Sequence, residues 1–146
     1  MAHRYLTIAL KEATRSQCRF RVGAVLVKGG RILGRSCNRR RNSARTDFRH
    51  ATFHAEEMLM RSTAAPRRAE VYVARLSSTG APMLARPCPR CQHLLVSCGI
   101  TLAHYTTSTG TTSSVHLPDN TAAPVPRSPA QPGPDRPGGR RETRRR

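Results

Sequence analysis

Apolar residues recur at helical spacing near the start of the chain. Intervals of three and four put one apolar stripe on a helix predicted over residues 2–15, and the stripe consists of Tyr5, Ile8, Ala9 and Ala13. The segment that follows, "RVGAVLVKGGRILGRS", has two runs of β-forming residues around a glycine pair. Glycines supply the positive φ angles of a tight turn, so this segment predicts a β-hairpin.

Beyond residue 53 the pattern alternates between helices and strands. It predicts helices over residues 55–64 and 89–98, the second closed by a glycine at its carboxyl end. Strands are predicted over the remaining apolar segments, residues 69–76, 100–107 and, as a short fifth strand, 112–117. Helices between strands require crossover connections, so we expect an α/β fold with a mixed, partly parallel sheet of four to five strands covered by helices.

Two regions fall outside this pattern. Residues 37–53 have no sustained periodicity and form a predicted long basic loop, and such loops inside compact domains are usually functional or disordered. From Pro118 onward the chain is rich in proline and arginine and ends "RRETRRR". No packed core can form from that composition. We therefore expect one domain over residues 1–116 and a disordered basic tail over 117–146, either inert or an electrostatic arm.

The charge of the chain is strongly positive, with a formal net charge of +18. Residues 1–116 carry 19 basic and 5 acidic side chains, so most of the excess lies on the predicted domain and not only in the tail. Such a domain suits a polyanionic partner, namely nucleic acid or an anionic surface. The alternative is a coding bias that raises arginine throughout the chain.

Targeting signals and a disulfide framework are not apparent in the sequence. No apolar run approaches the roughly 20 residues that span a bilayer, and the first residues lack the apolar stretch of a secretory signal. Five cysteines with one C-x-x-C pair argue against a secreted disulfide scaffold. We expect an intracellular protein with no membrane partner and with a metal or redox site.

The C-x-x-C pair, Cys88 and Cys91, lies at the start of a predicted helix, where the helix N-terminus favours thiolates. His54, at the first turn of the other helix, can offer an imidazole to the same ion. Three protein ligands leave a fourth tetrahedral position open, as in catalytic zinc sites, and Glu56 is placed beside it. A redox dithiol or a structural zinc knuckle completed by another cysteine is the alternative reading of the pair.

The sequences "HAE" at 54–56 and "PCPRC" at 87–91 resemble the signature of the zinc-dependent cytidine and nucleobase deaminase superfamily. The resemblance extends from about Tyr5 to Thr107 and includes "VGAVLVKGGRILGRSCN". It implies a cytidine-deaminase-like three-layer α-β-α fold, a bound Zn²⁺, and hydrolytic removal of an exocyclic amine. By this resemblance the zinc ligands are His54, Cys88 and Cys91, and Glu56 shuttles protons.

The same resemblance implies contacts with the substrate. Asn38 would hydrogen-bond the sugar or base, unless it only caps the hairpin, and the backbone around Ala24 and Ala55 would frame the base together with Phe53. Arg86 and the shortened region past Thr107 depart from the family pattern. Arg86 stands where many relatives carry glutamate or serine, which puts the base-facing wall in doubt. The topology of the last strand separates branches of the superfamily and cannot be predicted from this sequence.

The substrate is the harder question. The basic loop combines cations with stacking side chains, and we expect it to bind nucleic acid through Arg39, Arg40, Arg41, Arg45, Phe48, Arg49 and His50. The favoured substrate is cytosine in single-stranded DNA, because a polynucleotide gains most from the charge. The alternatives are a free cytidine, deoxycytidine or deoxycytidylate deaminase, an adenine deaminase acting on nucleic acid, and a non-catalytic zinc-stabilised binding module. The few aromatic residues count against a stacking surface, since we expect Tyr5, Phe20 and Tyr72 in the core.

Overall fold

The computed structural model describes residues 2–40 and 52–119, which form three helices and a mixed β-sheet. The main sheet has the strand order β2-β1-β5-β7-β8, and the short strand β6 pairs with β5. A separate pair joins β3 to β4. In chain order the elements are α1 (Ala2–Ala13), β1 (Arg21–Lys28), β2 (Arg31–Cys37), β3 (Arg39–Arg40), β4 (Thr52–Phe53), α2 (Ala55–Ser62), β5 (Glu70–Leu76), β6 (Pro82–Met83), α3 (Pro89–Ser97), β7 (Leu102–Thr106) and β8 (Thr112–His116).

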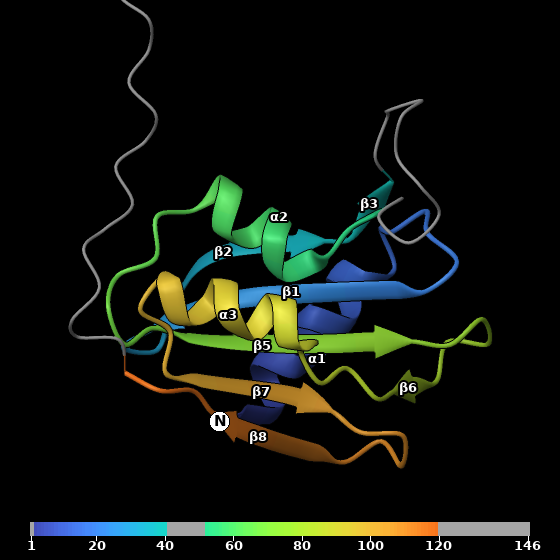
Figure 1. The fold of residues 1–146 in the computed structure, drawn as a ribbon. Helices are drawn as coiled ribbons and strands as arrows, with labels where there is room; N and C mark the ends of the chain where they lie inside the picture. The colour runs from blue at the N-terminus through green and yellow to red at the C-terminus, as the bar shows by residue number, and fades with distance from the viewer. Residues whose placement is uncertain (1, 41–51, 120–146) are drawn as a thin grey trace, which may run out of the picture.

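The helices cover both faces of the sheet. Figure 1 shows α2 and α3 in front of the strands and α1 behind them. One cluster of buried residues, including Leu26, Leu59 and Leu95, lies on the side of α2 and α3. A second cluster, including Tyr5 and Val25, lies on the side of α1. The predicted three-layer α-β-α architecture is therefore confirmed.

The connections between strands explain the mixed sheet. The β1–β2 hairpin is antiparallel and turns at Gly29 and Gly30, both with positive φ, as expected. β5 and β7 are parallel because α3 joins them as a crossover. β8 is antiparallel to β7, since the short turn around Gly110 returns the chain directly along its neighbour. The expected fifth strand is thus present, and its direction follows from the length of its connection.

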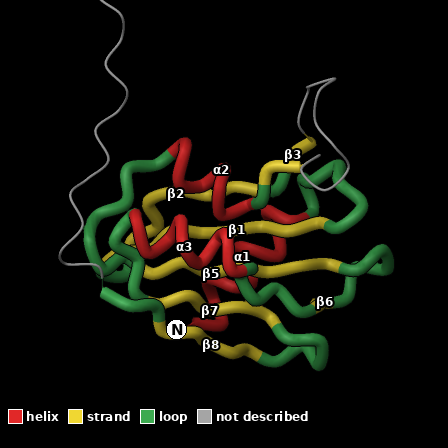
Figure 2. Tube along the Cα trace, viewed as in Figure 1, coloured by secondary structure: helices red, strands yellow, loops and turns green. Residues whose placement is uncertain are grey.

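The described part differs from the expected elements in three places. The ends of the expected basic loop pair as β3 and β4, so residues 37–53 are not wholly irregular. The turn-rich segment after β5 contains β6, while most of the β5–α3 connection is loop, as Figure 2 shows. Leu117 is buried and its N–H donates to the carbonyl of Thr101, which places this residue with the packed part. The expected tail otherwise falls mostly on residues 120–146, outside the described residues.

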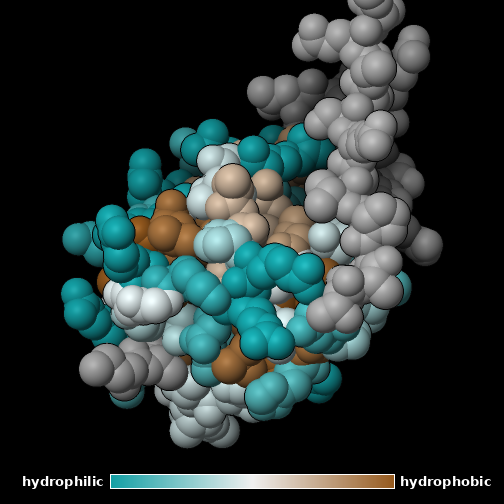
Figure 3. Space-filling model, turned by 90° about the vertical axis from the view of Figure 1, so that its left-hand side faces the viewer, coloured by the Kyte–Doolittle hydropathy of each residue, from teal (hydrophilic) through white to brown (hydrophobic). Residues whose placement is uncertain are grey.

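The end of the molecule that lies at the left in Figure 1 faces the viewer in Figure 3. Hydrophilic residues predominate there around smaller hydrophobic areas. Within residues 2–40 and 52–119, no helix is long and apolar enough to cross a membrane. All five cysteines belong to the described part, and none of them forms a disulfide.

Gly23 fixes the approach of α1 to the sheet. A Cβ at this position would overlap the carbonyl oxygen of Ala9 and the backbone nitrogen of Ala13, both on α1. We expect Gly23→Ala to lower the free energy of unfolding by about 3 kcal/mol, the upper end for overpacking, because backbone cannot move aside as a side chain can. Denaturant unfolding followed by circular dichroism measures this loss.

Gly34→Ala serves as the matched control for this prediction. The three atoms nearest to a Cβ at this position all belong to the side chain of Thr63, the C-cap residue of α2. We expect Thr63→Ala to restore the stability lost in Gly34→Ala, whereas no side-chain truncation can rescue Gly23→Ala. A Gly23→Ala variant as stable as the unchanged protein would contradict the close packing of α1 on β1.

Candidate active site and metal centre

Two helix N-termini meet at the candidate site. His54 is the N-cap residue of α2, and Cys88 is the N-cap residue of α3 with Cys91 in the following turn. The Cys88 sulfur accepts a hydrogen bond from the backbone N–H of Cys91 at 3.5 Å. A second contact ties the two helices together, because Arg90 of α3 pairs with Glu57 of α2 at 3.2 Å. The first turns of both helices are thus held side by side.

The three expected ligands converge on one point. The ligand atoms of His54, Cys88 and Cys91 all lie within 4.8 Å of one another. His54 Nδ1 is 3.3 Å from Cys91 Sγ and 3.6 Å from Cys88 Sγ. In a tetrahedral zinc site, Zn–S and Zn–N bonds of about 2.3 and 2.0 Å place nitrogen and sulfur about 3.5 Å apart. The spacing of these side chains therefore suits a shared zinc ion.

Cys91 is fully buried, and without a bound metal its burial determines whether the thiol is protonated. Burial raises the pKa of Cys91 far above its usual range, and the nearby Glu56 and Cys88 raise it further. The expected stabilisation of this thiolate by the helix N-terminus is therefore outweighed at Cys91. A divalent cation reverses this balance, because a coordinated thiol loses its proton.

Glu56 lies beside the ligand cluster with its side chain almost entirely buried. Burial is the main cause that raises its pKa from 4.5 to about 7, a hydrogen bond from its own backbone N–H lowers the pKa, and the smaller effects of Glu57 and Cys91 raise and lower it respectively. A carboxyl group with a pKa near neutrality can both accept and release a proton at physiological pH. This property suits the role of proton shuttle expected from the sequence, which stays a prediction.

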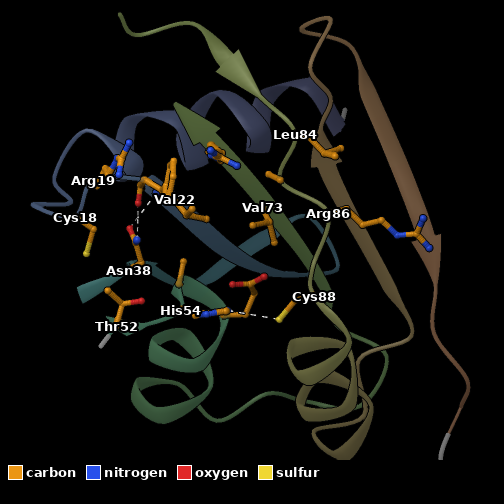
Figure 4. A pocket seen from close by; sticks show the side chains of 15 residues that line it. Cys18, Arg19, Val22, Asn38, Thr52, His54, Val73, Leu84, Arg86 and Cys88 are labelled. Carbon is orange, nitrogen blue, oxygen red and sulfur yellow. Dashed lines mark hydrogen bonds between the residues drawn. The ribbon is translucent and has the colours of Figure 1, made fainter. Parts of the chain in front are cut away.

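A pocket of about 320 Å³ opens next to these residues. Figure 4 shows His54 and Cys88 together at one end of it, with Arg19 and Leu84 at the other end on separate walls. The Arg86 side chain extends away from the ligand cluster in the same view, so the unusual residue before Pro87 does not crowd it. This volume lies at the lower end of the range that is typical of pockets for small molecules.

Asn38 lines this pocket and also organises the chain around it. Its Oδ1 accepts hydrogen bonds from Ser16 Oγ at 2.6 Å and from the backbone N–H of Val22 at 3.0 Å. Its Nδ2 donates to the carbonyl of Phe20 at 2.6 Å. An amide NH₂ carries two hydrogens, so one remains for a ligand. Asn38 thus holds the segment from residue 16 to 22 in place, and its expected contact with a substrate stays a prediction.

Of the other residues expected at the site, some line the pocket and others do not. Ala55 lines the pocket, whereas Ala24 is buried in the core and Phe53 lies under the guanidinium of Arg61 at 4.5 Å, neither of them among the lining residues. Their contacts with a base therefore stay predictions. Arg39 and Arg40 are exposed on β3. The remaining expected nucleic-acid contacts lie outside the described residues, namely Arg41, Arg45, Phe48, Arg49 and His50.

The expectation that Phe20 lies in the core was wrong, whereas Tyr5 and Tyr72 do lie there as expected. The Phe20 side chain is 55% exposed, because residue 20 precedes β1 and its ring lies against the guanidiniums of Arg19 and Arg75 at the pocket. Sequence reasoning also missed Leu84 in the same pocket. Their hydrophobicity alone gave no signal that these residues face solvent.

Comparison with protein families identifies the class of this chain. Residues 1–107 match the family described as "Cytidine and deoxycytidylate deaminase zinc-binding region". This match covers most of the chain, and the His54–Cys88–Cys91 cluster is the metal site that such a domain requires. The chain belongs to this family of zinc-binding deaminases, and its cofactor is Zn²⁺. A comparison with curated protein sequences gives no match.

Solved structures share the fold at low sequence identity. A cytidine deaminase from Burkholderia pseudomallei is 20% identical, with a TM-score of 0.61 over 80% of this chain and 92% of that one. The dCMP deaminase of cyanophage S-TIM5 in apo form is 24% identical, with a TM-score of 0.56 over 74% and 83%. A cytidine deaminase from Mycobacterium leprae is 22% identical, with a TM-score of 0.54 over 77% and 91%. These likenesses establish the fold.

Proposed function

We propose that the protein hydrolyses cytosine to uracil in single-stranded DNA. In this reaction the oxygen of one water molecule forms a bond to the ring carbon C4. The bond from that carbon to the exocyclic nitrogen breaks, ammonia leaves, and uracil remains. The membership of the family supports the deamination, and the charge of the surface around the pocket supports the strand as substrate.

Each residue of the site has one task in this proposal. His54, Cys88 and Cys91 hold zinc, which when bound supplies the Lewis acidity that makes water nucleophilic near neutral pH. Glu56 takes a proton from the attacking water and delivers one to the leaving nitrogen. The target base occupies the 320 Å³ pocket, which admits it only when it is unstacked from its neighbours. Single-stranded DNA meets that requirement at the lowest cost.

The observation that carries the choice of a strand is a basic groove beside the pocket. It has a volume of about 670 Å³ and is joined to the pocket by Asn38, which lines both. Its basic side chains are Arg15, Arg35, Arg39 and Arg40. Only Arg15 pairs with a carboxylate, that of Glu12, among residues 2–40 and 52–119. A phosphate backbone along this groove would be neutralised while its nucleotide enters the pocket.

A free cytidine or deoxycytidylate is the second candidate substrate. The pocket volume fits one nucleoside, and the structures with this fold include a cytidine deaminase and a dCMP deaminase. Such a substrate leaves the basic groove without a ligand. The two candidates therefore differ in what the groove arginines contribute to catalysis.

The test compares kcat/KM for a cytosine-containing single-stranded oligonucleotide with kcat/KM for deoxycytidine and deoxycytidylate. We expect the oligonucleotide to be the better substrate. We also expect Arg39→Gln/Arg40→Gln to lower its kcat/KM about tenfold at moderate salt, and to reduce the dependence of log kcat/KM on log salt by about 1.4, the contribution of two phosphate contacts to a single strand.

Arg31→Gln is the matched control, because Arg31 is exposed at the start of β2, at the other end of that strand from Asn38. It removes one positive charge at a position that does not line the groove, whereas the double variant removes two within it, so the oligonucleotide rate should stay nearly unchanged. Faster turnover of deoxycytidylate than of the oligonucleotide, with no effect of Arg39→Gln/Arg40→Gln on either, would overturn the strand in favour of the free nucleotide.

A further inference from the structure

Apolar side chains are exposed at the mouth of the candidate active site. In the described part of the chain, the exposed large hydrophobic residues are Phe20, Leu33 and Leu84. Two of these, Phe20 at 55% and Leu84 at 51% exposure, line the same pocket. Scattered single hydrophobic residues are normal on a surface, but two at one pocket mouth offer an apolar contact area to a ligand.

The backbone that carries Phe20 is held in place. Its carbonyl accepts a hydrogen bond from Asn38, whose other side-chain atom accepts from Val22 and from Ser16. Asn38 is buried and lies at the end of the β1–β2 hairpin. The Phe20 ring is therefore exposed to solvent on an ordered segment. Because this segment is already ordered, less conformational entropy is lost when a ligand stacks on the ring.

Two cations accompany this ring. The guanidinium of Arg75 is 4.5 Å from the ring centroid and that of Arg19 is 5.5 Å away, and both residues line the pocket. Neither pairs with a carboxylate within residues 2–40 and 52–119. Within the described residues, the buried Nε–H of Arg75 has no hydrogen-bond partner. The charges of both guanidiniums thus have no counter-charge within these residues, which favours an anionic ligand beside them.

We propose that Phe20, Leu84, Arg19 and Arg75 form a rim that binds the nucleotide next to the target cytosine. Phe20 and Leu84 contact the neighbouring base, and the two arginines contact the phosphate between the two nucleotides. This inference rests on the proposed function, since a free nucleotide has no neighbouring base. The position of Arg19 and Leu84 at the end of the pocket away from His54 and Cys88 agrees with that order (Figure 4).

The experiment uses zinc-loaded protein and single-stranded oligonucleotides with one cytosine each. They differ only in the residue on the 5′ or the 3′ side, which is either a normal nucleotide or an abasic one with the phosphate retained. We expect kcat/KM to be about tenfold higher with a normal base on one of the two sides, a conservative value for one stacked base. Phe20→Ala should bring this ratio close to one, and Phe20→Trp should preserve it.

Leu33→Ala is the matched control, because Leu33 is exposed on β2 and does not line the pocket. It should leave the ratio unchanged. A ratio computed within each variant cancels any general loss of activity or stability. Equal rates with normal and abasic neighbours, or a full ratio in Phe20→Ala, would overturn the rim while leaving the strand as substrate. Deamination of deoxycytidine with none of any oligonucleotide would overturn the proposed function and the rim together.

Discussion

Glu56→Gln is expected to lower kcat for deamination by about 10²–10⁴-fold, the usual contribution of a general acid–base group. Glutamine keeps the size and buried position of the side chain next to His54 and Cys91 but cannot carry a proton. The loss should therefore appear in kcat with zinc content and melting temperature nearly unchanged. Steady-state kinetics and metal analysis on the same preparation measure both.

Glu57→Gln provides the comparison for that result. Glu57 is also buried and follows directly in α2, but it pairs with Arg90 and accepts from the backbone N–H of His54. Its replacement should lower the melting temperature, which Glu56→Gln leaves nearly unchanged. It should lower kcat much less than Glu56→Gln does. Glu56→Gln with activity within threefold of the unchanged protein would exclude Glu56 as the proton shuttle.

Cys91→Ala is expected to abolish zinc binding and with it deamination. Cys91 is the fully buried member of the cluster, and its sulfur lies 3.3 Å from His54 Nδ1. The remaining pair, His54 and Cys88, leaves too few ligands for a stable tetrahedral site. We expect zinc content to fall from about one ion per chain to a small fraction of that value, as measured by atomic spectroscopy.

Cys98→Ala is the control for this loss, since Cys98 lies at the other end of α3 from the cluster. This variant should keep both zinc and activity. Chelation of the unchanged protein should remove activity reversibly and leave the helix and strand signals in circular dichroism, because the two hydrophobic clusters do not include the metal ligands. Unfolding on chelation, or zinc retained in Cys91→Ala, would contradict this account.

The sequence pattern predicted the helices and main strands to within a few residues, because periodicity and glycine turns are local signals. The cluster of His54, Cys88 and Cys91 could also be predicted, since each ligand lies at the start of a helix and two of them share one turn. The pairing of β3 with β4 could not, because two-residue strands carry no periodic signal.

The rim of the pocket was beyond prediction for a different reason. Phe20 and Leu84 carry the same hydrophobic character as core residues, and only the folded chain shows that both are exposed at the pocket. Arg75 and Arg19 come together through the ring of Phe20 although they are far apart in sequence. The burial of Glu57 could not be predicted either, because it follows from the contact between α2 and α3.

The most direct test of the account is the source of the oxygen in the product. Zinc-loaded protein is incubated in ¹⁸O-labelled water with single-stranded DNA that contains one cytosine, and the product is analysed by mass spectrometry. We predict uracil that carries the heavy oxygen, with ammonia released in equal amount, and at least a hundredfold less of both products from Glu56→Gln over the same time. Absence of uracil from this DNA and from deoxycytidine and deoxycytidylate, under conditions where zinc is bound, would contradict hydrolytic cytosine deamination by this protein.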